Sequence, residues 1–201
     1  MSGPWIKICG LTTPEAVSAA DGAGVDAIGF VFAESSRRVT PEQAWRLAAP
    51  VRRRIAVCAV VRRTSQSEVD EMLRVLRPDM LQVDVAELAR LALPRTIEVL
   101  PVASTRAPVP DVVPGMLLLE RPPADDAAGW DENAIRGLAR RTRLVLAGGL
   151  DAGNVAGLVR ACAPFGVDVS RGVEVAPGVK GQELIRRFVK TARSMNGVIA
   201  L

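Results

Sequence analysis

Cysteine, lysine and carboxylate side chains must carry any acid–base chemistry near neutral pH, because the 201 residues include no histidine and no tyrosine. Cys9 is the first candidate, since it closes the apolar run 5–9 and is followed by Gly10. A cysteine at the carboxyl end of a strand, next to a loop, is well placed to act as a base or nucleophile. A lone cysteine is also often only a small buried hydrophobic residue. Both interpretations stay open on this segment alone.

The composition fits one globular domain spanning residues 1–201, with 49% hydrophobic residues available for a core. No apolar run approaches the roughly 18 residues of a membrane span, and the N-terminus lacks the pattern of a signal peptide. We therefore expect a cytoplasmic protein in which Cys9, Cys58 and Cys162 are reduced thiols. Their wide spacing and the lack of histidine argue against a metal site.

The formal net charge of +4 favours a small anionic substrate over nucleic acid. The arginine clusters at 52–54, 62–63 and 140–141 are dispersed along the chain and interleaved with acidic residues. Only 3% of residues are aromatic, so the stacking platforms typical of single-strand binding are lacking. We expect neither a nucleic-acid nor a membrane partner, and a monomer or homodimer.

The elements that must position Cys9 follow a regular alternation. Helical patterns begin at Thr13-Pro14 and Thr40-Pro41, each a capping residue followed by proline, and also cover 65–76 and 151–162. Between them lie eight apolar, strand-like runs at 5–9, 26–32, 55–61, 80–83, 97–102, 116–119, 144–147 and 167–170. This order predicts a single (β/α)8 barrel, with a doubly wound open sheet as the alternative. Three prolines in 105–115 predict an irregular crossover there.

Side-chain alternation predicts which groups face the inside of such a barrel. Lys7 and Cys9 share one face of the first strand, and Asp168 takes the matching face of the eighth. A buried lysine needs a partner, so we expect Lys7 to pair with Asp168 across the seam where the first and eighth strands meet. The pair either only closes the barrel or also provides a positive charge that lowers the pKa of Cys9.

Two glycine-bearing turns follow the last two strands. Gly148-Gly149 ends the seventh strand, and Ser170-Arg171-Gly172 ends the eighth. In (β/α)8 enzymes the loops after these two strands often hold a phosphate with their backbone N–H groups. We therefore expect a phosphorylated small-molecule substrate at this edge of the barrel.

Several stretches of this chain match the pattern of one known family. They are Lys-Ile-Cys-Gly-Leu-Thr at 7–12, Val-Asp-Val-Ser at 167–170, and the segments 29–32, 36–41, 146–150, 172–174 and 177–178. Through them the chain resembles the phosphoribosylanthranilate isomerases of tryptophan biosynthesis over nearly its full length. The resemblance implies a (β/α)8 barrel without cofactor or metal. It also implies the Amadori rearrangement of N-(5-phosphoribosyl)anthranilate to 1-(2-carboxyphenylamino)-1-deoxyribulose 5-phosphate.

The same resemblance implies roles for individual residues. Cys9 takes the position of the family's general base, and Arg38 that of the arginine that holds the anthranilate carboxylate. The resemblance also places the phosphate on the loops with Gly148, Gly149, Ser170 and Gly172. We further count Lys7, Asp168 and Arg171 among the expected substrate-binding residues, from their predicted positions in the barrel.

The chain departs from the family pattern on the side opposite the phosphate. The family's general acid is an aspartate that ends the sixth strand, and Glu120 replaces it here, with Asp84, Asp125 and Asp126 as rival acids. The family's histidine after the fourth strand is replaced by Asp84, and the loop at 121–130 is shorter. Arg171 stands where the family usually has a small residue, and either adds a phosphate contact or fills part of the pocket.

Two functions are compatible with these departures. One is the isomerase, with Cys9 and Glu120 as catalytic residues. The other is a catalytically weakened or repurposed paralogue that binds a phosphosugar or a protein partner.

Overall fold

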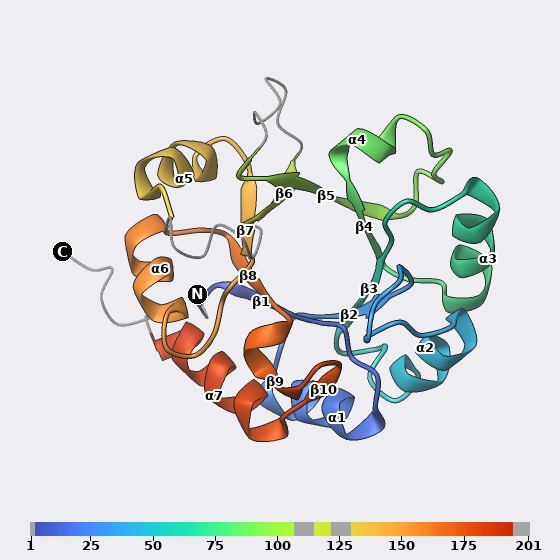
Figure 1. The fold of residues 1–201 in the computed structure, drawn as a ribbon, viewed down its shortest axis with the longest axis horizontal. Coiled ribbons are helices and arrows are strands. Elements are labelled where there is room, and N and C mark those ends of the chain that lie inside the picture. Colours follow the sequence, from blue (N-terminus) through green and yellow to red (C-terminus); the bar gives the residue numbers. More distant parts are fainter. Residues whose placement is uncertain (1–2, 107–114, 122–129, 195–201) are drawn as a thin grey trace.

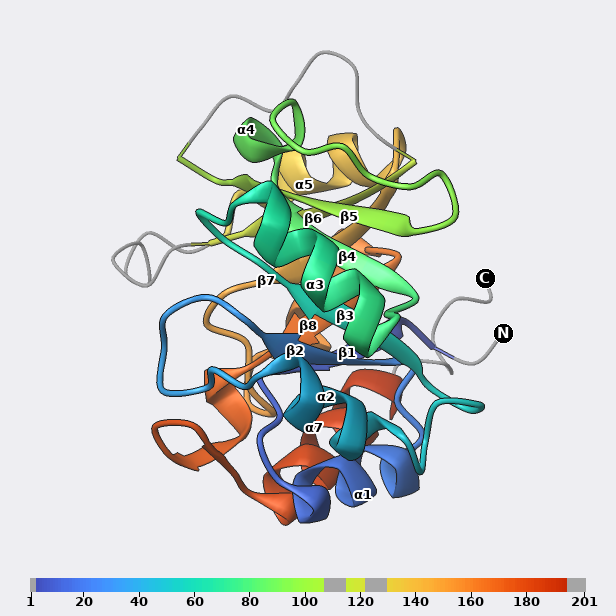
Figure 2. The ribbon, with the colours of Figure 1, turned by 90° about the vertical axis from the view of Figure 1, so that its right-hand side faces the viewer.

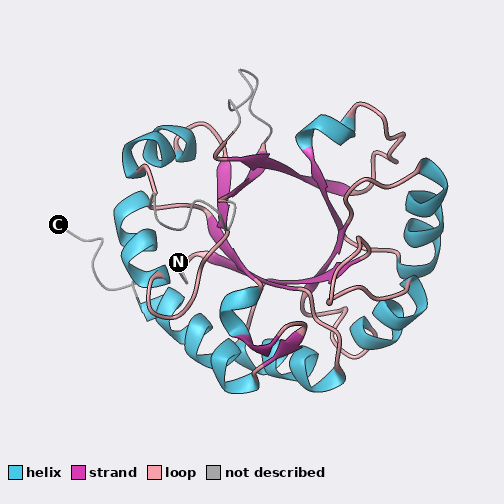
Figure 3. Cartoon of the chain, viewed as in Figure 1, coloured by secondary structure: helices cyan, strands magenta, loops and turns pink. Residues whose placement is uncertain are grey.

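A computed structural model describes residues 3–106, 115–121 and 130–194. Eight parallel strands close into a barrel in the order β1 to β8, and helices surround it (Figures 1 and 3). The closed barrel confirms the predicted (β/α)8 fold and excludes the open sheet. The barrel strands are β1 (Trp5–Cys9), β2 (Ala27–Val31), β3 (Ala56–Val60), β4 (Met80–Asp84), β5 (Glu98–Ser104), β6 (Met116–Glu120), β7 (Arg143–Ala147) and β8 (Gly166–Val169).

The connecting segments supply the outer layer. The described helices are α1 (Pro14–Ala23), α2 (Pro41–Ala48), α3 (Gln66–Leu76), α4 (Val85–Leu88), α5 (Glu132–Ala139), α6 (Val155–Cys162) and α7 (Gln182–Arg193). A short 3-10 turn, η2 (Arg171–Val173), and a hairpin of β9 (Glu174–Ala176) and β10 (Val179–Lys180) lie between β8 and α7. The predicted irregular crossover at 105–115 lies mostly outside the described residues. No helix in the described ranges is both long and apolar enough to cross a membrane.

Capping residues start the helices where the sequence predicts. The Thr13 side chain accepts a hydrogen bond from the Ala16 amide at 3.3 Å and begins α1. Thr40 begins α2 and Ser65 begins α3, each within a capping box that satisfies two free amides.

Helix α6 begins later than the pattern predicts. Asp151 Oδ1 accepts hydrogen bonds from the amides of Gly153, at 2.6 Å, and Asn154, at 3.1 Å. These bonds fold the segment into a turn that competes with helix formation. The first helical residue is therefore Val155, and the predicted helix over 151–162 is wrong in its first turn.

The strand alternation separates two apolar layers. Ile6 and Ile8 point outward into the large cluster between strands and helices, as predicted. The inside of the barrel holds a smaller cluster contributed by β3 to β7, namely Cys58, Met80, Leu100, Val102, Met116, Leu118, Val145 and Ala147. On β1 the inward face carries Lys7 and Cys9 next to Trp5, which packs against the inner cluster, so this side of the barrel interior is partly polar.

The closing seam aligns β1 with β8 in parallel register. Lys7 lies opposite Asp168 in this register, and Lys7 Nζ donates to Asp168 Oδ1 at 2.8 Å. The predicted pair is therefore present at the seam. In the side view of Figure 2 the loops that follow β2 and β8 lie at the same end of the barrel. This end is where the carboxyl ends of all eight parallel strands meet.

We predict that Asp168→Ala lowers the free energy of unfolding by about 3–5 kcal/mol, because it leaves the lysine charge buried and unpaired. Replacing both partners, with Lys7→Met and Asp168→Leu, should recover most of this loss. Urea unfolding of the two variants and the parent measures both effects. A single variant within 1 kcal/mol of the parent, on the order of an exposed pair, would show that the seam does not depend on the pair.

Candidate functional site

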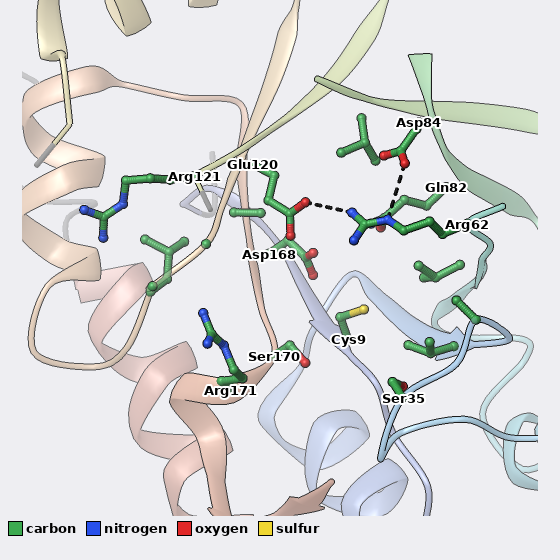
Figure 4. A pocket seen from close by; sticks show the side chains of 18 of the residues that line it. Cys9, Ser35, Arg62, Gln82, Asp84, Glu120, Arg121, Asp168, Ser170 and Arg171 are labelled. Atoms are coloured by element: carbon green, nitrogen blue, oxygen red, sulfur yellow. Dashed lines mark hydrogen bonds and ion pairs between the residues drawn. The ribbon is translucent and has the colours of Figure 1, made fainter. Parts of the chain in front are cut away.

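A cavity of about 340 Å³ opens at the carboxyl ends of the strands. Each barrel strand contributes at least one lining residue, among them Cys9, Val31, Val60, Gln82, Val102, Glu120, Ala147 and Asp168. We call it the Cys9 cavity (Figure 4). The site residues that the sequence predicts and that line it are Cys9, Glu120, Gly148, Gly149, Asp168, Ser170, Arg171 and Gly172.

Lys7 does not line the cavity itself, but its ion-pair partner Asp168 does. Its side chain is completely buried, whereas Asp168 is 7% exposed and lines the cavity. Burial alone would lower the pKa of Lys7, but the charges of Asp168, Cys9 and Cys58 outweigh burial and raise it. Lys7 is therefore a permanent positive charge inside the barrel, next to the two thiols of Cys9 and Cys58.

The thiol of Cys9 has a raised pKa in the free protein. Burial is the largest cause, and the positive charge of Lys7 opposes it without cancelling it. The expectation that Lys7 lowers the pKa of Cys9 below that of a free thiol is thus wrong in its net direction. Cys58 is buried deeper among apolar side chains, and burial raises its pKa to about 12. This environment fits its predicted role as a packing residue.

Gly29 makes room for Cys9, and sequence reasoning did not single it out. It lies opposite Cys9 in the register of β1 and β2. A Cβ atom at this position would lie 3.1 Å from Cys9 Sγ and 3.4 Å from Lys7 Nζ. Any side chain here would therefore push on the thiol or the ammonium group. The only sequence signal for Gly29 was its place in a stretch that resembles the family.

The two glycine-bearing turns after β7 and β8 pack against other backbone segments as well as lining the cavity. Gly148 has a positive φ of 96°, and a Cβ there would overlap the carbonyl oxygen of Arg121. A Cβ at Gly172 would overlap the carbonyl oxygen of Leu150. Glycine is thus required at both places by close backbone approach, whatever ligand the turns hold.

A buried ionic network supports the turn after β8. Lys180 Nζ donates to the carbonyl oxygen of Ser170 at 2.9 Å, to its hydroxyl at 3.1 Å and to Glu174 Oε1 at 2.7 Å. Arg37, from the loop after β2, donates two hydrogen bonds to the same carboxylate at 2.6 and 2.7 Å. Burial would raise the pKa of Glu174, but these two cations hold it at about 2.

This network fixes the loops after β2 and β8 relative to each other beside the cavity. Arg37 and Glu174 lie in stretches that resemble the family, but no role for either residue follows from the sequence alone. Nothing in the sequence marks Lys180 as buried, since a lysine near a chain's end is ordinarily exposed.

Glu120 lies at the cavity mouth in an ion pair with Arg62. The distance from Arg62 Nη2 to Glu120 Oε2 is 3.1 Å, and that from Arg62 Nε to Asp84 Oδ2 is 3.3 Å (Figure 4). One guanidinium thus joins the ends of β3, β4 and β6. Asp84 lines the same cavity and remains a rival acid, whereas Asp125 and Asp126 lie outside the described residues.

Arg38 is not brought into the Cys9 cavity. Its side chain is 55% exposed, and its guanidinium pairs at 3.5 Å with Glu34, four residues earlier in the loop after β2. It lines a neighbouring pocket together with Phe32, Arg62 and Arg63. Its role in binding the anthranilate carboxylate stays a prediction.

Comparisons with known proteins agree with this geometry. The family model of N-(5'-phosphoribosyl)anthranilate isomerase matches residues 6–191. The N-(5'-phosphoribosyl)anthranilate isomerase of Mesorhizobium japonicum is 35% identical, over 94% of this chain and 95% of its own length.

Solved structures give the same result. The crystal structure of TrpF from Jonesia denitrificans superposes with a TM-score of 0.82 at 36% identity, covering 96% of this chain and 98% of that one. A phosphoribosylanthranilate isomerase solved with reduced 1-(o-carboxyphenylamino)-1-deoxyribulose 5-phosphate has a TM-score of 0.76 at 26% identity, over 95% and 99% of the two chains. With its fold, its strand-end cavity and these relatives in agreement, this chain belongs to the N-(5'-phosphoribosyl)anthranilate isomerase family.

Proposed function

We propose that this protein is an isomerase that converts N-(5'-phosphoribosyl)anthranilate to 1-(2-carboxyphenylamino)-1-deoxyribulose 5-phosphate in tryptophan biosynthesis, with Cys9 as general base and Glu120 as general acid. The observation that carries the assignment of roles is the shared cavity. A thiol at the end of β1, a carboxyl group at the end of β6 and two glycine-bearing turns after β7 and β8 all line it.

The proposed reaction consists of proton transfers within one substrate. Glu120 gives a proton to the ring oxygen of the ribose, the bond between that oxygen and C1 breaks, and the anilino nitrogen forms a C=N bond to C1. Cys9 as thiolate then takes the proton from C2. The electrons of that C–H bond form a C1=C2 double bond, and the π electrons of the C=N bond return to the nitrogen. The resulting enol takes a proton at C1 and loses the proton of its C2 hydroxyl group, which gives the ketone. No electron is gained or lost, so the steps need no cofactor.

The phosphate end of the substrate is assigned to the turns after β7 and β8. Gly148, Gly149, Ser170 and Gly172 present backbone at the cavity wall, and Arg171 adds a positive charge there. The support comes from the position of these turns, since exposed backbone amides at such strand ends suit phosphate. Lys180 binds both Ser170 and Glu174, and Arg37 binds Glu174, so this ionic network supports the turn after β8.

Lys7 and Asp168 are assigned to the substrate site through their position under Cys9. Lys7 Nζ lies against the same Gly29 position as Cys9 Sγ, so its charge acts on the thiol at short range. A positive charge there favours the thiolate that the proposed base requires. The oligomeric state, monomer or homodimer, stays a prediction.

We predict that Cys9→Ser reduces turnover about a hundredfold or more, as is typical when a general base is removed. The rate of conversion of the synthetic phosphoribosyl substrate measures it. Cys162→Ser is the matched control and should stay close to the parent, because Cys162 packs in the outer layer on α6. Near-parental activity of Cys9→Ser would remove Cys9 from the mechanism.

We predict that Glu120→Gln abolishes the isomerisation, whereas Glu120→Asp retains or improves it. The amide cannot donate the proton, while aspartate keeps the carboxyl group and shortens its reach by one methylene. Both variants are compared by turnover and by rescue of a tryptophan auxotroph that lacks this step. Full activity of Glu120→Gln would assign the proton transfer to a rival carboxyl group such as Asp84. Absence of turnover in the parent, with Cys9 intact, would favour the weakened paralogue.

We predict that Cys9 in the free protein titrates above the pKa of about 8.5 of an unperturbed cysteine. The cause is burial, which raises the pKa of this thiol despite Lys7. The rate of alkylation of Cys9 by iodoacetamide, followed by mass spectrometry as a function of pH, measures it. The rate should keep rising beyond pH 8.5. A plateau below that pH would mean that the charge of Lys7 prevails over burial.

A further inference from the structure

The side-chain amide of Gln82 is a polar group in the Cys9 cavity that the proposed reaction leaves without a role. Gln82 lies on β4 and lines the cavity, and its amide oxygen, Oε1, is buried without a hydrogen-bond partner among the described residues. Figure 4 shows this residue across the cavity from Ser170 and Arg171. A buried acceptor without a partner costs free energy, so the amide here points to a partner from outside the chain, either water or a ligand.

The strand neighbours of Gln82 are apolar. In the register of the barrel it lies opposite Val60 on β3 and Leu100 on β5. Met80, two residues earlier on the same face of β4, packs in the inner apolar cluster. The next inward residue, Asp84, is bound to an arginine. An amide in this place therefore finds its partner in the cavity rather than in the barrel wall.

The proposed reaction puts one particular substrate atom in front of this amide. In the closed barrel β4 lies four strands from β8, so Gln82 faces the turns assigned to phosphate from the opposite wall. Of the four groups on carbon C2, the hydrogen faces Cys9 and C3 leads back towards the phosphate. C1 carries the ring oxygen that Glu120 protonates from β6. The hydroxyl group on C2 is the group left to face β4.

We propose that the amide of Gln82 binds the oxygen on C2 of the substrate, as a hydroxyl group before the reaction and as a ketone after it. This inference rests on the function proposed above. An amide carries an acceptor oxygen and two N–H donors, so it can accept from the hydroxyl group and donate to the ketone. A carboxylate such as Asp168 only accepts, and would lose its bond when the ketone forms.

The contact would act on the chemical step as well as on binding. A bond to the C2 hydroxyl group fixes the rotation of the substrate so that the C2 hydrogen points at Cys9. Donation from Nε2 to the same oxygen stabilises the negative charge that this oxygen gains as its O–H bond breaks. The proton of that bond passes to water, and its electron pair forms the C=O bond. The amide itself neither gains nor loses a proton.

The test measures binding of two stable ligands, so it does not depend on turnover. One is reduced 1-(2-carboxyphenylamino)-1-deoxyribulose 5-phosphate, which keeps a hydroxyl group on C2, and the other is the same molecule without that hydroxyl group. Calorimetric titration of the full-length parent should give a preference of about tenfold for the first, as expected for a hydrogen bond to a buried group.

Variants of the amide separate its role from the shape of the wall. Gln82→Met, which keeps the length of the side chain, should lose most of this preference. Gln82→Glu keeps an acceptor oxygen and should retain part of it. Val60→Ala changes the shape of the same wall and should alter the binding of both ligands alike, leaving the preference as it is in the parent.

A second measurement distinguishes a ligand-binding amide from a structural one. Gln82→Met in the free protein should unfold in urea at the same midpoint as the parent or at a higher one, because it removes a buried acceptor without a partner. Its kcat should nevertheless fall about tenfold, as expected for one lost hydrogen bond. A lower unfolding midpoint would assign the glutamine to the fold instead.

Several binding results would overturn the role of Gln82. They are an undiminished preference in Gln82→Met, a parent without any preference, and loss of the preference in Asp168→Asn alone. A third ligand, without the hydroxyl group on C3, adds another: if Gln82→Met removes the preference for that group instead, the amide does not bind the C2 oxygen. A parent that shows the preference through Gln82 but does not isomerise the substrate would contradict the proposed function and leave the binding role intact.

Discussion

The buried ion pair between Lys7 and Asp168 is the constraint on which the rest of the site depends. It bridges the closing seam, where Lys7 and Asp168 lie directly opposite each other in the register of β1 against β8. Cys9 and Ser170 each follow two residues later, so the same register carries the thiol and the turn after β8 to one end of the barrel. The pair replaces apolar packing on this side of the barrel, and buried pairs are costly to desolvate. The positive charge of Lys7 opposes the effect of burial on the pKa of Cys9, so the pair also acts on the proposed base.

A second set of charges secures the wall of the cavity. Lys180 and Arg37 both bind Glu174, and this joins the hairpin β9–β10 to the loop after β2. The pKa of Glu174 is about 2 in the folded protein, well below its ordinary value near 4.5. A group with a depressed pKa stabilises the fold above its unfolded pKa, and the contribution fades as the pH falls from about 4.5 towards 2. The turn with Ser170 is thus held by charges that persist across the whole neutral range.

The sequence predicted the parts of this site that follow from strand geometry. Alternation on β1 and β8 is enough to place Lys7, Cys9 and Asp168 inside the barrel, because a strand fixes the direction of each successive side chain. It could not place Arg38 or Arg62, which follow the strands. The direction of a loop side chain depends on local backbone angles, and Arg63, with a φ of 52°, turns the chain just after Arg62. The net pKa shift of Cys9 was also beyond the sequence, because it is a balance between burial and a neighbouring charge.

The residues that depart from the family pattern near the acid contact one another through a shared arginine. Glu120 and Asp84 replace two family residues that are far apart in the sequence, yet both bind Arg62. The longer side chain at 120 is therefore not a free carboxyl displaced by one methylene, because the arginine at the end of β3 fixes where its oxygens lie. A displacement of about 1 Å at a reacting group can cost about a hundredfold in rate, so the position that this ion pair gives the Glu120 carboxyl group bears directly on the proposed proton transfer. The altered side of the cavity is thus one connected cluster of charges, and its effect on the reaction depends on all three residues together.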